Sequence, residues 1–435
     1  MPDHAGGLAV GDEVEVEVAV VAHGGHCVAR HEGQVLFVRH TLPGERVLAR
    51  VTETGAGQRF VRADAVEVLR ASPDRVTPPC PWAGPGRCGG CDFQHVALAR
   101  QRVLKADVVR EQMARLARLD VDVTVEPVPG DVEGLDWRTR VEFAVDAGGR
   151  AGLRRHRSHD VVPIDHCRIA APGIDRLRVP EQQWPGSDAV DAVAPSIGPP
   201  LMVPVPVDEA PVVRERVQVA WRGSDGQEHA LEEDLSVSAR GFWQVHPGAA
   251  ATFVRAVLEA VDPSPGDRAM DLYAGVGLFT VALAEAVGPA GQVVAVESDP
   301  TAVAHARENL VGHSNVAVLA QRVDDAFGVP RPARRGTAGQ RGSRGRKVAR
   351  SPLMPSAADV VVLDPPRTGA GRGVCAEVAA LGARVVVYVA CDPAALARDT
   401  AYLADAGYRL SGLRAFDAFP MTHHVECVAR FVRAR

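Results

Sequence analysis

The sequence predicts an α/β protein with a doubly wound, mostly parallel sheet in its C-terminal part, preceded by a small β-barrel and a mixed α+β segment. Three observations predict this fold. After residue 262, apolar strand-like runs alternate with helix-like runs, which is typical of a parallel sheet with crossover helices. Residues 11–68 hold short runs of alternating polarity, separated by glycine turns, as in a small barrel. Residues 69–91, between them, are rich in Pro, Gly and Cys.

The length of 435 residues predicts several domains. We place an OB-like barrel at 1–68, a central domain at 69–260 and the doubly wound domain at 261–435. Within the central domain, apolar side chains at helical spacing predict a helix over 93–119, which can pack on the C-terminal domain. The many prolines of 179–211 predict irregular structure there.

The C-terminal domain is predicted from its buried runs. Strands are expected at 269–272, 293–297, 316–319, 360–364 and 385–390, with helices at 278–287 and 300–310. Residues 331–350 carry seven Arg, one Lys and no acid, which predicts a surface insertion. This insertion is either a solvated loop or a contact with nucleic acid.

Bulk composition excludes several classes of protein. The chain is 46% hydrophobic and 24% charged, an ordinary globular balance, and no apolar run is long enough to span a bilayer. The first residues do not have the layout of a signal peptide. We therefore expect a cytoplasmic monomer without a membrane partner. The net charge of −5 gives no signal for nucleic-acid binding by the molecule as a whole.

Cys391 is the first candidate for a reactive group. It directly follows the apolar run 385–390, and Pro393 then turns the chain. Reactive groups of open α/β sheets gather at the carboxyl ends of strands, where a thiol is well placed to act as a nucleophile. The alternative is a packed cysteine, because free Cys is among the most buried residue types.

A cofactor site is predicted at Asp271–Gly277, which follows one strand and opens a helix. Gly275 and Gly277 let the backbone approach a ligand closely. The next strand ends in Glu297, and an acid at that place accepts hydrogen bonds from ribose hydroxyls. Position 280 is Thr, so the third glycine of the dinucleotide fingerprint is missing. The motif resembles class I S-adenosylmethionine methyltransferases more than nicotinamide enzymes.

Asp364-Pro365-Pro366-Arg367 ends another predicted strand beside this cleft. Many methyltransferases that act on exocyclic amines carry an acid, two prolines and an aromatic residue here. The Arg at position 367 argues against methylation of an amine.

Together, the motifs resemble those of the RNA uracil carbon-5 methyltransferase family, which modifies transfer RNA and ribosomal RNA. The motifs are Phe242–Val245, Asp271–Gly277, Asp364–Arg367, Ala390–Pro393 and His424–Glu426. The resemblance runs from the barrel to the C-terminus and excludes the Arg-rich insertion. The barrel looks like the TRAM module of this family, which binds RNA.

The resemblance implies a role for each matching residue. Cys391 would be the nucleophile that adds to carbon 6 of uracil, and Glu426 the base that removes the proton from carbon 5. Gln244 and Asp364 match positions that hold the cofactor and the substrate base, and Tyr273 matches an aromatic that contacts the cofactor. Without the resemblance, Glu426 would be read as a surface carboxylate beside a strand.

Three positions depart from the family pattern. Leu278 stands where many members have Asn, and Arg322 where an acid or amide often contacts adenine. His246 replaces a frequent Asn. The sequence therefore leaves adenine recognition open.

Four cysteines form a second candidate site: Cys80, Cys88, Cys91 and Cys167. The Cys-x2-Cys pair can share a metal centre that two further thiolates complete. In the ribosomal-RNA branch of the family, four matching cysteines hold a [4Fe–4S] cluster, and zinc is the alternative. Cys27, Cys375 and Cys427 are expected to be ordinary thiols.

The sequence thus predicts an S-adenosylmethionine-dependent enzyme that forms 5-methyluridine in ribosomal or transfer RNA and flips the target base out of its stack. Two alternatives stay open. One is methylation of another RNA atom, which would not need Cys391. The other is a non-catalytic RNA-binding iron–sulfur protein, against which the intact set Cys391, Glu426 and Asp364 argues.

Overall fold

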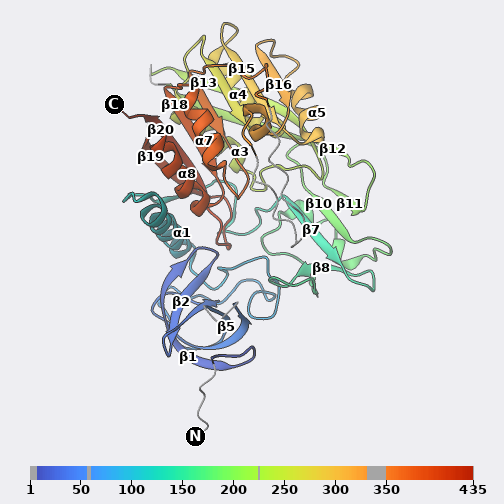
Figure 1. The fold of residues 1–435 in the computed structure, drawn as a ribbon. Coiled ribbons are helices and arrows are strands. Elements are labelled where there is room, and N and C mark those ends of the chain that lie inside the picture. The colour runs from blue at the N-terminus through green and yellow to red at the C-terminus, as the bar shows by residue number, and fades with distance from the viewer. Residues whose placement is uncertain (1–6, 56–59, 224–225, 331–348, 435) are drawn as a thin grey trace, which may run out of the picture.

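The computed structural model describes residues 7–55, 60–223, 226–330 and 349–434. Figure 1 shows the N-terminal barrel at one end, the large C-terminal sheet at the other and the central strands to one side. Most of the Arg-rich segment predicted at 331–350 lies outside the described residues. Within the described part, no helix has both the length and the apolar character needed to cross a membrane.

The predicted N-terminal barrel is present and closed, with the strand order β1-β2-β3-β5-β4. Alternating side chains fill its interior, and Val47, Ala49 and Val51 of one strand are buried while Arg46 and Arg50 face outward. This is the period-2 burial of a strand with one dry face. The strands are β1 Glu13–Ala22, β2 His26–His31, β3 Gln34–Arg39, β4 Arg46–Thr54 and β5 Val61–Arg70.

Helix α1, Leu98–Gln112, connects the barrel to the rest of the molecule and ends in a π-helical turn, Met113–Ala117. The helix predicted at 93–119 therefore starts later than expected. On α1, the fully buried Lys105 donates to Asp417 and to the carbonyl of Phe419. This ion pair ties the helix to the C-terminal sheet.

The central region contains a five-stranded antiparallel sheet in the order β11-β10-β7-β8-β9. The prediction of irregular structure over 179–211 was wrong, because β10 and β11 lie there. Pro204 sits in the edge strand β11, where a missing N–H is tolerated. The elements are β7 Arg140–Val145, β8 Ala151–Arg154, β9 Val161–Pro163, α2 Pro172–Asp175, a 3-10 turn Val179–Glu181, β10 Ala189–Val193 and β11 Leu201–Val205.

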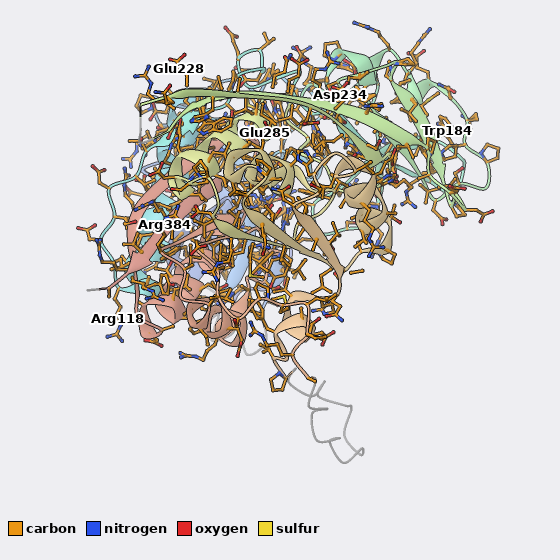
Figure 2. The ribbon with its side chains drawn as sticks, turned by 90° about the horizontal axis from the view of Figure 1, so that it is seen from above. Arg118, Trp184, Glu228, Asp234, Glu285 and Arg384 are labelled. Atoms are coloured by element: carbon orange, nitrogen blue, oxygen red, sulfur yellow. The ribbon has the colours of Figure 1, made fainter. Side chains whose placement is uncertain are left out.

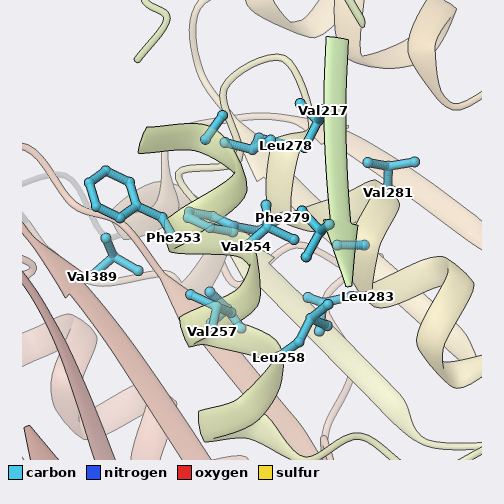
Figure 3. Close-up of a cluster of buried hydrophobic side chains, with 14 of the residues drawn as sticks. Val217, Phe253, Val254, Val257, Leu258, Leu278, Phe279, Val281, Leu283 and Val389 are labelled. Atoms are coloured by element: carbon cyan, nitrogen blue, oxygen red, sulfur yellow. The ribbon is translucent and has the colours of Figure 1, made fainter. Parts of the chain in front are cut away.

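A long hairpin then crosses toward the C-terminal sheet. It consists of β12, Val212–Arg222, and β13, Glu228–Ser238, and Figure 2 labels Glu228 and Asp234 along it. Helix α3, Ala249–Val261, follows. Figure 3 shows its apolar side chains packed among those of β12, α4 and β18. This stretch before residue 261 shares one hydrophobic core with the C-terminal sheet.

The C-terminal sheet has eight strands in the order β16-β15-β14-β17-β18-β20-β19-β6. The five strands from β16 to β18 are parallel, as predicted, whereas β20 runs antiparallel to both of its neighbours, β18 and β19. The chain adds β15 and β16 on one side of β14 and then β17 and β18 on the other, so the strand order reverses between β14 and β17. Ligands of doubly wound sheets bind at such a switch point. The strands are β6 Val125–Pro127, β14 Arg268–Leu272, β15 Gln292–Glu297, β16 Val316–Ala320, β17 Val360–Leu363, β18 Val385–Ala390, β19 Tyr408–Asp417 and β20 Glu426–Arg433.

The helices of this region begin near the carboxyl ends of the parallel strands. They are α4 Leu278–Val287, α5 Pro300–Asn309, α6 Val323–Phe327, α7 Gly371–Ala380 and α8 Pro393–Asp405. The first turns of these helices therefore lie at the same end of the sheet as the ends of β14 and β17.

Candidate active site

Cys391 and Glu426 lie opposite each other where β18 ends and β20 begins. Ala390, the last residue of β18, pairs with Cys427 of β20 in an antiparallel ladder. The next position outward therefore sets Cys391 opposite Glu426. The thiol is partly buried, and the carboxyl group is 4% exposed. The structure thus brings together two residues that are 35 positions apart in the sequence.

Carboxyl groups dominate the surroundings of this thiol. Burial raises the pKa of Cys391 to about 12, and the charges of Glu426 and Asp364 act in the same direction. Burial and the charge of Asp364 also raise the pKa of Glu426. Arg367 opposes both shifts. The pocket therefore favours the protonated forms of the thiol and of Glu426.

The turn after Cys391 is fixed by a helix cap. The Asp392 carboxylate accepts a hydrogen bond from the backbone N–H of Ala395 at 2.8 Å, and Pro393 is the first residue of α8. An N-cap Asp and a first-turn Pro are preferred at helix starts. They determine where the chain leaves β18 and hence where the thiol lies.

The predicted cofactor turn lies at the switch point, at the ends of β14 and β15. Tyr273, Gly275 and Gly277 have positive φ angles of 66°, 56° and 95°. The backbone N–H of Gly275 donates to the Glu297 carboxylate at 2.9 Å. Space beside Gly275 is open, so a ligand can reach this backbone directly. Tyr273, Gly275, Gly277 and Glu297 are thus brought together.

Asp271, at the start of this turn, is fully buried. Burial raises its pKa to about 7, and the Thr280 hydroxyl donates to it at 2.5 Å. Asp364 follows β17, next to β14, and burial and the charge of Asp271 raise its pKa. Thr280, which takes the place of a third glycine, therefore holds the acid that opens the motif.

A further pair at the site was missed by sequence reasoning. The Tyr388 hydroxyl donates to Asp399 at 2.7 Å, and the N–H groups of Ala370 and Gly371 donate to the same carboxylate. These bonds hold the end of the loop that begins at Asp364. One signal was available, because a tyrosine inside the apolar run 385–390 needs a polar partner when buried.

Gln244 lies in the connection between β13 and α3 and is 8% exposed. The carbonyl of the adjacent Val245 accepts hydrogen bonds from the backbone N–H and the hydroxyl of Thr139. Val245 lines a cavity of about 200 Å³ together with Arg367 and His424. The Gln244 segment thus borders the space in front of the Asp364 loop.

The four predicted metal-site cysteines line one larger cavity of about 360 Å³: Cys80, Cys88, Cys91 and Cys167. Burial raises the pKa of Cys88, Cys91 and Cys167, and the charge of another thiol of the set adds to each rise. Across the described ranges, no three His, Cys, Asp or Glu side chains form a group that could hold a metal ion. Gly89, Gly90, Arg138 and His156 line both cavities, so the two adjoin.

The three departures from the family pattern have distinct surroundings. Leu278 is buried in the core at the start of α4. Arg322 forms an ion pair with Asp324 at 3.0 Å. His246 is buried, stacked on Trp137 with ring centroids 5.7 Å apart.

A doubly wound sheet with such a glycine turn at its switch point and an acid at the end of the next strand is typical of class I S-adenosylmethionine-dependent methyltransferases. A solved structure with a similar fold is that of Pyrococcus abyssi tRNA (uracil-54, C5)-methyltransferase in complex with S-adenosyl-L-homocysteine. The similarity has a TM-score of 0.63 at 22% identity and covers 96% of this chain and 99% of that one.

Two family models match the chain: tRNA (Uracil-5-)-methyltransferase over residues 237–433 and the TRAM domain over 8–66. An uncharacterized RNA methyltransferase of Streptomyces avermitilis is 49% identical, with 97% of this chain and 98% of the relative covered. The 23S rRNA (uracil(1939)-C(5))-methyltransferase of Chromohalobacter salexigens is 33% identical, with 95% and 88% covered. The chain belongs to the RNA uracil-C5 methyltransferase family.

Proposed function

We propose that the protein forms 5-methyluridine in RNA through a covalent adduct between Cys391 and carbon 6 of the target uracil. The observation that carries this proposal is the ladder register that sets Cys391 opposite Glu426, with Asp364 beside both. A nucleophile and a base at one strand edge are what the reaction needs.

Each residue has a role that follows from the chemistry of uracil. Carbon 5 is a poor nucleophile until the Cys391 sulfur bonds to carbon 6, which leaves an enolate that is nucleophilic at carbon 5. S-adenosylmethionine, when bound, supplies the methyl group to carbon 5 and leaves as S-adenosylhomocysteine. Glu426 then accepts the proton from carbon 5. The electrons of that C–H bond form the double bond between carbons 5 and 6, and the bond to sulfur breaks.

The raised pKa values suit this order of events. Burial and the charge of Asp364 raise the pKa of Glu426, so this carboxyl group has to be ionised before carbon 5 gives up its proton, and the carboxylate is then a stronger base than an ordinary one. Cys391 stays protonated in the free protein because its pKa is about 12. As the sulfur bonds to carbon 6, the thiol proton passes to solvent water.

For the cofactor, we propose Gln244, Tyr273, Gly275, Gly277, Glu297 and Asp364 as the binding residues. The strongest support is at the turn, where the Glu297 carboxylate meets the N–H of Gly275 and the glycines leave the backbone open. In this proposal, Glu297 accepts hydrogen bonds from the ribose hydroxyls.

The substrate that the relatives favour is ribosomal RNA, because the similarity to 23S rRNA enzymes spans nearly the whole chain. Transfer RNA is the alternative. We further propose that the barrel at 1–68 contacts this RNA, as an OB-like module, and that the target base leaves its stack to reach Cys391.

To test the function, purified protein is incubated with S-adenosylmethionine and either 23S rRNA or transfer RNA transcripts, followed by nucleoside mass spectrometry. We expect 5-methyluridine, and a denaturation-resistant complex when the transcript contains 5-fluorouridine. Methylation of another nucleoside atom, or methylation without a covalent complex, would contradict the proposal.

We also propose that Cys80, Cys88, Cys91 and Cys167 hold a [4Fe–4S] cluster. The support is a cavity of about 360 Å³ that all four thiols line, which suits a group larger than one ion. Zinc, the alternative, would need the four sulfurs drawn to a single centre. The cluster would serve the stability of the central domain, since such centres couple to folding.

A further inference from the structure

The turn between β1 and β2 of the barrel reaches the catalytic region. We call residues 23–25 of this turn the hairpin tip. His23, at its start, places Nε2 3.1 Å from Oδ2 of Asp392. Asp392 directly follows Cys391 and caps α8. A residue near the N-terminus of the chain is thus in direct contact with the neighbour of the proposed nucleophile.

The other end of the tip is closely packed. Gly25 has a φ of +78°, and a Cβ there would come within 2.9 Å of the His423 Cβ and 3.1 Å of the Asp92 Cβ. Asp92 in turn contacts Arg39 of β3 at 3.3 Å and His423 Nδ1 at 2.5 Å. The loop holding His423 leads directly into Glu426. The barrel therefore contacts the chain next to both proposed catalytic residues.

The two carboxylate oxygens of Asp392 have different partners. Oδ1 accepts the hydrogen bond from Ala395 N–H that starts α8, and Oδ2 pairs with His23. A carboxylate held at both oxygens cannot rotate without breaking one contact. The His23 contact therefore restrains the turn that carries the Cys391 thiol.

We propose that His23 is a positioning residue. When the RNA-binding barrel is packed against the C-terminal domain, His23 holds the Asp392 cap, and the cap in turn holds the Cys391 sulfur in position to attack uracil. This inference rests on the proposed role of Cys391 as the nucleophile. It assigns a part in the chemical step to a side chain of the N-terminal barrel.

The charges around His23 give the contact a pH dependence. The hydrogen bond to Asp392 raises the pKa of His23 above 6.5, against burial; Glu111 on α1 adds to the rise and Arg115 opposes it. The ion pair is therefore complete below pH 6.5 and is lost as pH rises through the raised pKa. Glu111 and Arg115 also pair with each other at 3.5 Å.

The experiment compares wild type with His23→Ala and His23→Lys, and uses His31→Ala, at the far end of β2, as the matched control. The readout is the single-turnover rate of adduct formation with saturating 23S rRNA transcribed with 5-fluorouridine, between pH 6 and pH 8.5. RNA affinity and thermal unfolding are measured on the same samples.

We expect His23→Ala to slow adduct formation about three- to fivefold at pH 6, as for a half-exposed ion pair, with unchanged RNA affinity. The ratio of wild-type to variant rate should fall toward one as pH rises. His23→Lys should restore the rate and hold the ratio constant with pH, because its charge persists. His31→Ala should behave as wild type.

Equal rates for wild type and His23→Ala at pH 6 would overturn the inference, as would a loss of RNA affinity with an unchanged rate at saturation. If His23→Ala unfolds, a His23→Lys protein that is stable but slow and unresponsive to pH would also overturn it. Cys391→Ala, run in parallel, separates the two proposals. An adduct in that variant contradicts the proposed function, whereas its absence beside a fully active His23→Ala contradicts only the positioning role.

Discussion

Cys391 and the four cysteines that line the larger cavity are alike in being partly buried, but they differ in their neighbours. Cys391 lies at a strand end among carboxyl groups, with Arg367 as the opposing charge. The thiols of Cys88, Cys91 and Cys167 line one cavity, and the charge of another thiol of the set contributes to the raised pKa of each. Burial raises the pKa in both regions. The neighbours therefore differ in kind: carboxyl groups surround Cys391, for which we propose proton transfer, whereas other thiols surround the second group, for which we propose a cluster.

The largest effect is expected from Cys391→Ala, which removes the proposed nucleophile. Loss of a nucleophile that acts together with its base costs about 10⁴-fold or more in rate, so methylation and adduct formation should both disappear. Cys375→Ala, which changes a buried thiol on α7, is the control and should keep the adduct. Methylation by Cys391→Ala at more than a few per cent of the wild-type rate would contradict the role of Cys391 as the nucleophile.

Glu426→Gln should separate the two halves of the reaction. The amide cannot accept the proton from carbon 5, so the methylated adduct should accumulate and turnover should fall about 10²- to 10⁴-fold. Gel electrophoresis under denaturing conditions with unmodified RNA measures the trapped complex. Glu285→Gln, exposed on α4, is the control. Normal turnover in Glu426→Gln would assign the proton to another group.

Cys88→Ser tests the second group of thiols. We expect anaerobically purified wild type to contain about four irons per chain and the variant to lose most of them, with a lower unfolding temperature because such a centre is coupled to folding. Cys27→Ala, in the barrel core, should keep its iron. Stoichiometric zinc and no iron in the wild type would favour the alternative metal.

Arg367→Gln should produce the smallest change. Arg367 lowers the pKa of Cys391, so its removal should raise that pKa further and reduce the thiolate fraction at a given pH. Because Arg367 is exposed, we expect only about a twofold slower alkylation of Cys391 by iodoacetamide at pH 8, followed by peptide mass spectrometry. Arg372→Gln, exposed on α7, is the control, and faster alkylation in Arg367→Gln would reverse the assigned sign.

Sequence reasoning found the parallel strands well because both faces of β17 and β18 are covered, which produces continuous apolar runs such as 385–390. It also predicted that Cys391 and the glycine turn follow strand ends, which the ends of β18 and β14 confirm, while their roles stay predictions. The face-to-face arrangement with Glu426 came from the family resemblance alone. Its structural cause is the antiparallel register of β18 and β20, a pairing between distant segments that local patterns do not reveal.

Other features depended on tertiary partners that the sequence does not name. Strand β11 forms in a proline-rich stretch because an edge strand needs hydrogen bonds on one side only. Asp399 showed no local signal, although it holds the loop after Asp364. The contact of His23 with Asp392 joins residues at opposite ends of the chain, and only the folded arrangement of barrel and sheet brings them together.

The central claim is that Cys391 carries the uracil during methyl transfer. It is tested most directly by peptide mapping of the Glu426→Gln protein after incubation with S-adenosylmethionine and unmodified 23S rRNA transcript. We predict one modified peptide, containing Cys391 joined to a methylated uridine. Modification of another cysteine, or 5-methyluridine in the RNA of wild type without any cysteine adduct in the variant, would contradict the account.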